Sequence, residues 1–87
     1  MNLQWTEEGW ADYLYWQKND IKTLARINDL IKDIHRNHYR GIGKPEPLKH
    51  DKHGYWSRRI DNKNRIVYKV NDGVITITQC RTHYDDK

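Results

Sequence analysis

The stretch IKTLARINDLIKDI at residues 21–34 decides how this chain folds, because its apolar side chains recur at steps of three and four residues. That spacing places them along one side of an α-helix and leaves charged and amide side chains on the rest of its surface. Residues 37–39 end the helix, and Gly41 and Gly43 prevent its continuation. We therefore predict a helix whose apolar stripe lies in the core. The stripe comprises Ile21, Leu24, Ile27, Leu30 or Ile31, and Ile34.

A strand and a shorter helix are predicted ahead of it. Residues 3–5 form a short strand candidate, and Thr6 is a suitable N-cap followed by Glu7 and Glu8, which complement the helix dipole. The helix then runs to about Lys18, and the pair at residues 19–20 breaks it and caps the next one. The side chains that set its three- and four-residue spacing are Trp10, Tyr13, Leu14 and Gln17.

Three strand candidates follow at residues 55–60, 65–70 and 74–81. The turns between them lie at 61–64 and at Asn71-Asp72-Gly73, and the second is a strong hairpin signal. The order strand, helix, helix, then antiparallel meander predicts an α+β fold. In it, two N-terminal helices pack on one face of a small antiparallel sheet, and the other face is free to meet a ligand. Residues 1–87 form a single domain.

Alternation along the strands assigns side chains to the two faces of the sheet. Ile66 and Tyr68 mark the core face of the middle strand, so Arg65 is expected on the open face. The last strand stays unassigned at this point. Gln79 reads as an open-face residue but has the same parity as the apolar Ile77, and a bulge or twist would be needed to separate them.

Charge is distributed unevenly along the chain. Residues 1–33 carry six acidic and four basic side chains, whereas residues 34–84 carry eleven basic and four acidic ones, a net charge of +7. A basic C-terminal half indicates one face suited to a polyanion such as RNA. Ordinary solvated charge explains the same numbers, so charge alone leaves both interpretations open.

Cysteine content and hydropathy bear on the compartment. The single cysteine, Cys80, excludes an internal disulfide and reads as a small buried apolar residue. No apolar run approaches the roughly 20 residues of a membrane span, and the N-terminus does not begin a signal peptide. We expect a cytoplasmic protein that does not associate with a membrane.

The segment Gly43 to His50 contains a single carboxylate, Glu46, between Pro45 and Pro47. Each proline restricts its own backbone and that of the residue before it, so Lys44 and Glu46 are expected to be extended. A stiff backbone on both sides is a means of holding a general base at a fixed distance from its substrate.

Glu46 combines with three other polar residues into a set that can cut RNA without a metal. A carboxylate can remove the proton of a ribose 2′-hydroxyl, a guanidinium such as Arg65 can hold the phosphate, and the imidazole of His83 can protonate the leaving oxygen. Tyr84 can pack or stack on a base. The basic residues that read as either phosphate contacts or solubilising charges are Lys44, Lys49, Lys52, Arg58 and Arg59.

Two His-x-x-His pairs, His35/His38 and His50/His53, have a spacing that zinc sites use. Basic and acidic residues lie between the members of each pair, and Pro47 stands close to the second. We interpret all four histidines as basic loop residues and predict no metal and no other cofactor.

Over nearly its whole length the chain resembles the YoeB-type toxins of the RelE superfamily, which belong to bacterial type II toxin–antitoxin pairs. The most specific motifs are Gly-Lys-Pro-Glu-Pro-Leu-Lys at residues 43–49 and Trp-Ser-Arg-Arg-Ile at residues 56–60. The other matching stretches are residues 5–8, 12–17, 27–33, 65–68 and 80–84.

The resemblance implies a RelE-like, microbial-ribonuclease-like fold and a ribosome-dependent endonuclease that cleaves messenger RNA and inhibits translation. Carried over by position, Glu46 would be the general base, Arg65 the cation that stabilises the transition state, and His83 the general acid. Tyr84 would position or stack the nucleotide. The RNA- or phosphate-binding residues would be Lys44, Lys49 and Arg59.

The resemblance also implies partners, namely the ribosome with its messenger RNA and a YefM-type antitoxin, and it leaves a homodimer possible. Family members commonly stop at the His-Tyr pair, whereas residues 85–87 follow here, which puts the environment of Tyr84 in question. Two alternatives remain open. One is a non-catalytic basic module that binds RNA or the ribosome, and the other is a ParE-like toxin that poisons gyrase.

Overall fold

The structure is a computed structural model of the chain, and it describes residues 1–82. The sequence predictions for His83 and Tyr84 therefore lie outside the described residues. The elements, in chain order, are β1 (Asn2–Trp5), α1 (Glu7–Asn19), α2 (Ile21–Arg36), β2 (Glu46–Pro47), the 3₁₀ turn η1 (His50–Lys52), β3 (Trp56–Arg59), β4 (Arg65–Asn71) and β5 (Val74–Gln79). Within residues 1–82 no helix has the length and apolarity to cross a bilayer.

Both helices begin at the predicted caps. The Thr6 hydroxyl accepts a hydrogen bond from the Gly9 amide at 3.1 Å, and the Asp20 carboxylate accepts one from the Thr23 amide at 3.1 Å. Each cap satisfies an amide that the first turn of a helix otherwise leaves without a partner. The two helices are thereby separated at Asp20 into an antiparallel pair.

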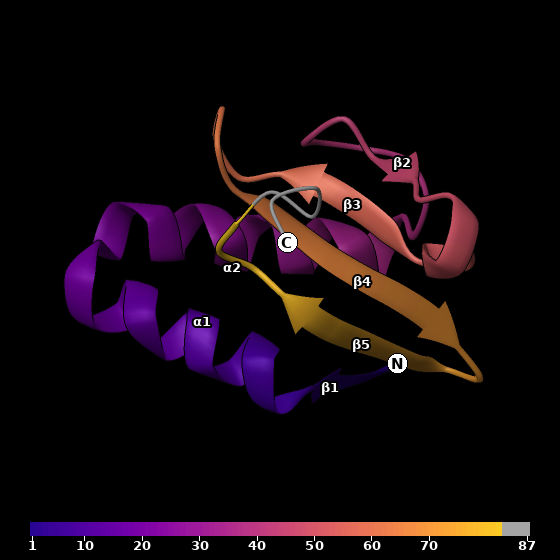
Figure 1. Cartoon of the computed structure of the whole chain (residues 1–87), viewed down its shortest axis with the longest axis horizontal. Helices are drawn as coiled ribbons and strands as arrows, with labels where there is room; N and C mark the ends of the chain where they lie inside the picture. Colours follow the sequence, from indigo (N-terminus) through magenta and orange to yellow (C-terminus); the bar gives the residue numbers. More distant parts are fainter. Residues whose placement is uncertain (83–87) are drawn as a thin grey trace.

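The five strands form one sheet in the order β1-β5-β4-β3-β2, with β4 in the middle between β3 and β5 (Figure 1). The pairs β3–β4 and β4–β5 are antiparallel, as the meander predicted. The sheet as a whole is mixed, because β1 pairs with β5 in parallel. Residues 3–5 indicate a strand but not its direction, which is set by the long connection through both helices and the meander. The edge strand β2 was not foreseen, since two residues are too few for an alternation pattern.

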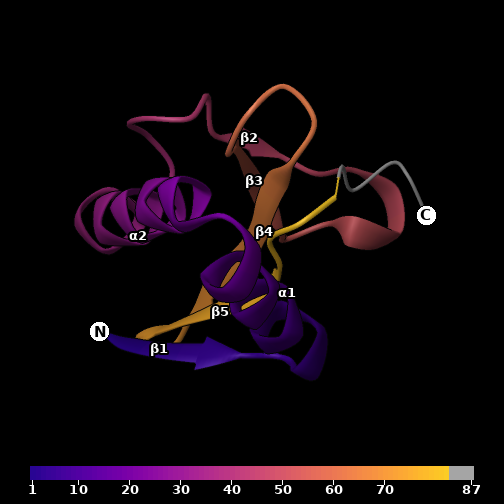
Figure 2. The same ribbon diagram turned by 90° about the vertical axis from the view of Figure 1, so that its left-hand side faces the viewer.

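The helices cover one face of the sheet and enclose the core. Figure 2 shows α2 on one side of β3 and β4 and η1 on the other. Four of the predicted stripe positions are buried, whereas Ile21, at the first residue of α2, is 66% exposed. The core residues from the helices are Trp16, Leu24, Ile27, Leu30, Ile31 and Ile34, and those from the sheet side are Ile60, Ile66, Tyr68, Ile75, Ile77 and Cys80.

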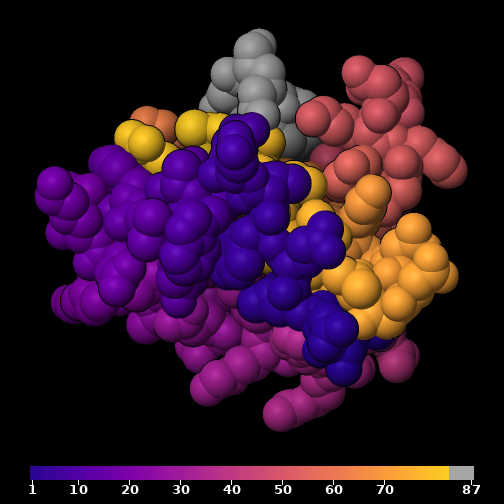
Figure 3. Space-filling model, turned by 90° about the horizontal axis from the view of Figure 1, so that it is seen from below, coloured from indigo at the N-terminus to yellow at the C-terminus, as the bar shows by residue number. Residues whose placement is uncertain are grey.

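The buried side of α1 differs from the spacing that its apolar residues suggested. Gly9 and Trp16 are the buried residues of this helix, while Trp10 and Leu14 are 46% and 41% exposed. A side chain at position 9 would place its Cβ only 2.5 Å from the Ile77 carbonyl oxygen, so the glycine allows α1 to approach β5 closely. The surface of α1 and β1, in indigo and violet in Figure 3, therefore carries exposed apolar side chains.

A β-bulge resolves the parity conflict in the last strand. Tyr68 pairs with Ile77, but the preceding residue, Val67, pairs with Gln79, so Thr78 is the extra residue. The extra residue shifts the alternation of side chains by one position. Ile77 therefore stays in the core, and Gln79 lies on the opposite face of the sheet.

One arginine lies entirely inside the protein. Arg58 of β3 faces the helices, has no exposed side-chain surface, and forms an ion pair with Asp33 of α2 at 2.5 Å through Nη1. Nη1 also donates to the Ile42 carbonyl oxygen at 3.2 Å, and Nη2 donates to the carbonyl oxygens of Asn37 and Arg40 at 2.5 and 2.7 Å. The prediction that Arg58 is a phosphate contact or a surface charge is wrong, because alternation places it on the core face of β3.

The fifth donor of Arg58 joins this network to the middle of the sheet. Arg58 Nε donates to the Tyr68 hydroxyl at 3.2 Å, and that hydroxyl donates to the His38 carbonyl oxygen at 2.6 Å. Burial raises the pKa of Tyr68, although the neighbouring guanidinium opposes the shift. The phenol therefore stays protonated and serves as a donor throughout the physiological range.

The network fixes the loop that leads to Glu46. The Ile42 amide donates to Asp33 Oδ2 at 3.0 Å, and the Arg59 amide donates to the Gly43 carbonyl oxygen at 2.7 Å. Three residues after Gly43 the chain enters β2 at Glu46. The end of α2, the following loop and β3 are thus held to one buried side chain.

We predict that Arg58→Met lowers the free energy of unfolding by roughly 3–5 kcal/mol, because it removes one partner of a buried ion pair and leaves several carbonyl groups without a donor. Arg59→Met is the matched control, since Arg59 is the exposed neighbour on the same strand and its replacement should cost less than about 0.5 kcal/mol. Urea unfolding measures both changes. Equal, small losses in the two variants would contradict the role given to Arg58.

Stability should also fall in acid through Asp33. The hydrogen bond from Arg58 lowers the pKa of the Asp33 carboxyl below its ordinary 3.8, against the opposing effect of burial. A carboxyl with a lowered pKa in the folded state stabilises the fold above the unfolded value of about 4 and loses that contribution as the pH falls further. Asp33→Asn should be less stable than wild type at neutral pH and should lose less stability below pH 4.

The acid dependence in Asp33→Asn should be reduced but not abolished, since hydrogen bonds from Thr23 also lower the pKa of Asp20. Denaturant unfolding at a series of pH values from about 3 to 7 measures the two slopes. If stability depends on pH identically in wild type and variant, the Asp33 carboxyl has the same pKa in the folded and the unfolded state, which would contradict the prediction.

Candidate active site

A row of four residues crosses the face of the sheet that the helices leave open. Glu46 pairs with Ser57, Ser57 with Val67, and Val67 with Gln79. Residues directly opposite one another in neighbouring strands point to the same side, and each strand step is roughly 4.8 Å. Glu46 therefore stands at the β2 edge of this row and Gln79 at its β5 end.

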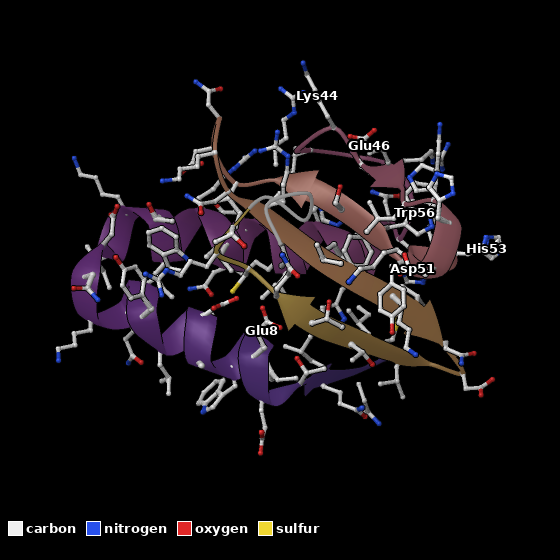
Figure 4. All side chains as sticks on the ribbon, viewed as in Figure 1. Glu8, Lys44, Glu46, Asp51, His53 and Trp56 are labelled. Carbon is white, nitrogen blue, oxygen red and sulfur yellow. The ribbon has the colours of Figure 1, made fainter. Side chains whose placement is uncertain are left out.

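Glu46 is exposed and extended, as its flanking prolines predicted. Lys44 is also exposed, and Figure 4 shows both side chains at the same edge of the molecule, beside β2. The backbone prediction for Lys44 is wrong, because its φ is +50° and so left-handed rather than extended. Proline disfavours the right-handed helical region for the residue before it, which leaves the left-handed turn after Gly43 available.

Arg65 lies on the open face as predicted. It pairs with Arg59 at the start of β4, two residues before Val67, so it shares the face of Glu46. Its side chain is nevertheless only 7% exposed. Nη1 donates to the carbonyl oxygens of Asp61 and Asn64 at 2.9 and 3.1 Å. Within residues 1–82, Nε and Nη2 make no hydrogen bond, so two nitrogens of the guanidinium are available for an anion.

The turn before β4 holds the guanidinium of Arg65 in place. The Asp61 carboxylate accepts from the amides of Lys63 and Asn64 at 2.8 and 2.6 Å, which closes the turn and aims two carbonyl groups at the guanidinium. Burial raises the pKa of Asp61, but these hydrogen bonds and the nearby Arg65 outweigh it, and the net shift is downward. Sequence reasoning identified the turn but gave no sign that its carbonyl oxygens hold Arg65.

The chain returns to this turn at its C-terminal end. The Arg65 amide donates to the Thr82 carbonyl oxygen at 3.4 Å, and the Gln79 side chain lies 3.5 Å from the same oxygen. Thr82 is the last described residue, so the structure brings the chain to Arg65 immediately before His83. The positions of His83 and Tyr84 lie outside the described residues.

The three predicted phosphate contacts all lie at the surface. Lys44, Lys49 and Arg59 are exposed, and Arg59 lies opposite Arg65 in the β3–β4 register. Lys49 follows the buried Leu48, whose side chain anchors this part of the loop. The structure therefore groups Arg59 with Arg65 directly and places the two lysines on the loop around Glu46.

Among the described residues 1–82, the remaining ionisable groups form no second cluster of the kind that metal or thiol chemistry requires. Cys80 is fully buried, as predicted, and burial raises the pKa of its thiol to about 12. His38 Nδ1 lies 2.8 Å from the Ile34 carbonyl oxygen. In the part of the chain from 1 to 82, no three side chains among His, Cys, Asp and Glu come together as a metal site would require.

Comparison with known proteins gives a consistent match. The family model for YoeB-like toxins of bacterial type II toxin–antitoxin systems matches residues 5–84, a range that contains every predicted site residue. Toxin YoeB of Escherichia coli strain K12 is 54% identical over 84 residues, which are 97% of this chain and 100% of that protein.

Solved structures agree with the sequence match. A YoeB/ParE toxin from Agrobacterium tumefaciens superposes with a TM-score of 0.93 at 48% identity, covering 97% of this chain and 100% of that one. A YoeB dimer and a heterotetrameric YoeB–YefM toxin–antitoxin complex, both from Staphylococcus aureus, give TM-scores of 0.90 and 0.89. Each is 46% identical and covers 97% of this chain and 98% of the matched chain.

Proposed function

We propose, since the chain belongs to the YoeB-like toxins of bacterial type II toxin–antitoxin systems, that it cuts messenger RNA on the ribosome and thereby inhibits translation. The observation that carries the proposal is the position of Glu46. Its exposed carboxylate shares the open face of the sheet with Arg65 and Arg59, while the helices and the core occupy the other face.

Glu46 is the general base of the proposed reaction. Its carboxylate removes the proton of a ribose 2′-hydroxyl, and the freed oxygen attacks the adjacent phosphorus. β2 is held by its pairing to β3 and by the loop that Arg58 anchors, so the carboxylate is presented from a fixed backbone. A base in a fixed position loses little entropy when the substrate arrives.

Arg65 stabilises the charge that develops on phosphorus. The turn at residues 61–64 holds one nitrogen of its guanidinium and leaves Nε and Nη2 for the phosphate oxygens. A buried, preorganised cation stabilises such charge more than a mobile surface lysine does. Arg59, opposite Arg65, and Lys44 and Lys49, near Glu46, bind the neighbouring phosphates.

His83 completes the reaction as general acid. The bond between phosphorus and the 5′ oxygen breaks, and protonated His83 gives that oxygen its proton, leaving a 2′,3′-cyclic phosphate and a 5′-hydroxyl. The support for this role is that His83 directly follows Thr82, which lies beside Arg65. Tyr84 positions the nucleotide. The sequence of steps needs no metal and no organic cofactor.

Control of such a nuclease requires an inhibitor. A YoeB protein of Staphylococcus aureus forms a complex with YefM, and we propose that this chain likewise binds a YefM-type antitoxin. The basic C-terminal half suits an acidic segment that folds as it binds. A YoeB protein of the same species has been solved as a dimer, so a homodimer of this chain is part of the proposal. Action on the ribosome places the protein in the cytoplasm.

Glu46→Gln tests the general base. The substitution keeps the shape of the side chain and removes its basicity, so messenger RNA cleavage should fall by roughly 10²-fold or more. Glu7→Gln, an exposed replacement of the same kind in the first turn of α1, is the matched control and should cleave at the wild-type rate. Cleavage is measured by primer extension in a translation extract.

The same experiment separates the alternatives. Full inhibition of translation by Glu46→Gln with intact messenger RNA would support a non-catalytic binding module instead. Intact messenger RNA with wild-type protein, together with gyrase-dependent DNA damage, would support the ParE-like alternative.

Arg65→Ala should reduce turnover at saturating substrate more than Lys49→Ala does, because Arg65 acts mainly on charge that develops in the transition state. Lys49→Ala should weaken binding in a salt-dependent way, and lowering the salt concentration should restore its activity. Thermal unfolding of both variants checks that the turn at residues 61–64 is intact. Equal losses, both repaired at low salt, would make Arg65 a binding residue only.

A further inference from the structure

The open face carries a pocket that the proposed cleavage steps do not use. It has a volume of about 250 Å³ and lies between β4, β5 and the segment around η1. Val67 and Gln79 of the cross-sheet row line it from the sheet, and Asp51, Lys52 and Tyr55 line it from the η1 side. Figure 4 shows Asp51 on the η1 side and Glu8 of α1 on the other side of β5.

The pocket lies at a fixed distance from the proposed base. Val67 stands two strand steps from Glu46 in the row, so their backbones are roughly 10 Å apart. A ligand in the pocket is therefore near the reacting phosphate but does not overlap it. An RNA strand whose scissile phosphate lies between Glu46 and Arg65 brings a neighbouring nucleotide to this position.

Size and lining favour a nucleobase over other ligands. The volume is below the 300–1,000 Å³ typical of sites for whole drug-sized molecules, and it suits one planar ring system. Tyr55 offers an aromatic ring, whose centroid lies 5.2 Å from Lys69 Nζ, and bases of single-stranded RNA stack on such rings. Asp51 and Glu8 border the pocket together with Lys52, so the lining is not the purely cationic surface that a phosphate prefers.

The polar groups on the η1 side are available for a ligand. Among residues 1–82, the side chains of Asp51, Lys52 and Tyr55 form no hydrogen bond and no ion pair, and the one ion pair is Asp33–Arg58. Asp51 is an acceptor only, and Lys52, the next residue in the chain and also part of the lining, is a donor only. A ligand edge that complements both must present donors next to an acceptor.

Guanine has that edge. Its N1–H and N2–H₂ groups are adjacent donors that the two oxygens of one carboxylate can accept, and its O6 is an adjacent acceptor for an ammonium group. Adenine and cytosine present one amino group beside a ring-nitrogen acceptor, which repels a carboxylate. Uracil presents one N–H between two carbonyl groups. A carboxylate thus discriminates among the four bases through the donors that each presents.

We propose that this pocket binds a guanine base next to the cut, with Asp51 accepting from N1–H and N2–H₂, Lys52 donating to O6, and the Tyr55 ring stacking on the base. The inference rests on the proposed RNA-cleaving function of the same face. It gives the nuclease a base preference and assigns that preference to the segment from Asp51 to Tyr55.

Binding of short RNAs tests the proposal without cleavage. Trinucleotides that differ only in guanine, hypoxanthine or adenine, with a 2′-deoxy sugar at the scissile position, are titrated into the full-length protein. Guanine should bind roughly ten-fold tighter than hypoxanthine, which lacks only the N2 amino group. Asp51→Asn should reduce that ratio to about two-fold or less.

The matched control is Asp72→Asn, in the exposed turn between β4 and β5, where φ is +53° and asparagine is well tolerated. It should keep the ten-fold ratio. Both variants replace exposed carboxylates and should unfold at the wild-type temperature. An unchanged guanine preference in Asp51→Asn, or no guanine preference in wild type, would overturn the assignment.

Cleavage mapping separates this inference from the function on which it rests. Messenger RNAs with all four bases at each position around the cut are digested in a translation extract by wild type and by Asp51→Asn. Efficient cleavage with the same base preference in both proteins would refute the pocket assignment and leave the nuclease proposal standing. Guanine binding that depends on Asp51, with no cleavage by wild type, would refute the nuclease proposal and leave the pocket assignment standing.

Discussion

The buried guanidinium of Arg58 is the constraint on which the rest of the structure depends. Taking a charged group out of water costs several kcal/mol, and the cost is offset only when its donors are all used. Arg58 meets that condition with bonds to the Asp33 carboxylate, the Tyr68 hydroxyl and three carbonyl oxygens. Those partners come from α2, the loop after it and the middle strand of the sheet. One side chain therefore fixes the relative positions of the elements around the site.

The residues that stabilise the fold and the proposed site residues lie on opposite faces of β3 and β4. On the helix side, Arg58 and the apolar core hold the fold. On the other side, Glu46, Arg59 and Arg65 are presented toward solvent or held at its edge. The bulge at Thr78 maintains this division in β5, because without it Gln79 would point into the core. Glu46 and Arg59, the exposed site residues of this face, can therefore change with little effect on the core.

Much of the fold followed from local patterns in the sequence. Three kinds of signal act between residues close in sequence, so their effects can be predicted without knowing the tertiary structure. They are the apolar stripe in α2, the caps at Thr6 and Asp20, and the Asn71-Asp72-Gly73 turn. Features that depend on contacts between residues far apart in sequence could not be predicted. The parallel direction of β1 is one case, and the burial of α1 through Gly9 against Ile77 is another.

The site was predictable to a similar extent. Alternation placed Arg65 on the open face, and the prolines around Glu46 indicated its extended backbone. The burial of Arg65 under the carbonyl groups of a turn had no sequence signal. Arg58 was misjudged because neighbouring arginines look alike in sequence, although one is in the core and the next is exposed. Residues 83–84 lie outside the described part, so their roles stay predictions.

The ends that cleavage leaves on messenger RNA test the account most directly. Attack by a ribose 2′-hydroxyl, with Glu46 as base and no metal, leaves a 2′,3′-cyclic phosphate or its hydrolysed 3′-phosphate upstream and a 5′-hydroxyl downstream. Messenger RNA cleaved by the wild-type protein in the presence of a chelator should carry these ends, identified by enzymatic end-labelling and mass spectrometry. A 5′-phosphate with a 3′-hydroxyl, or cleavage that stops when divalent metal is removed, would contradict the mechanism.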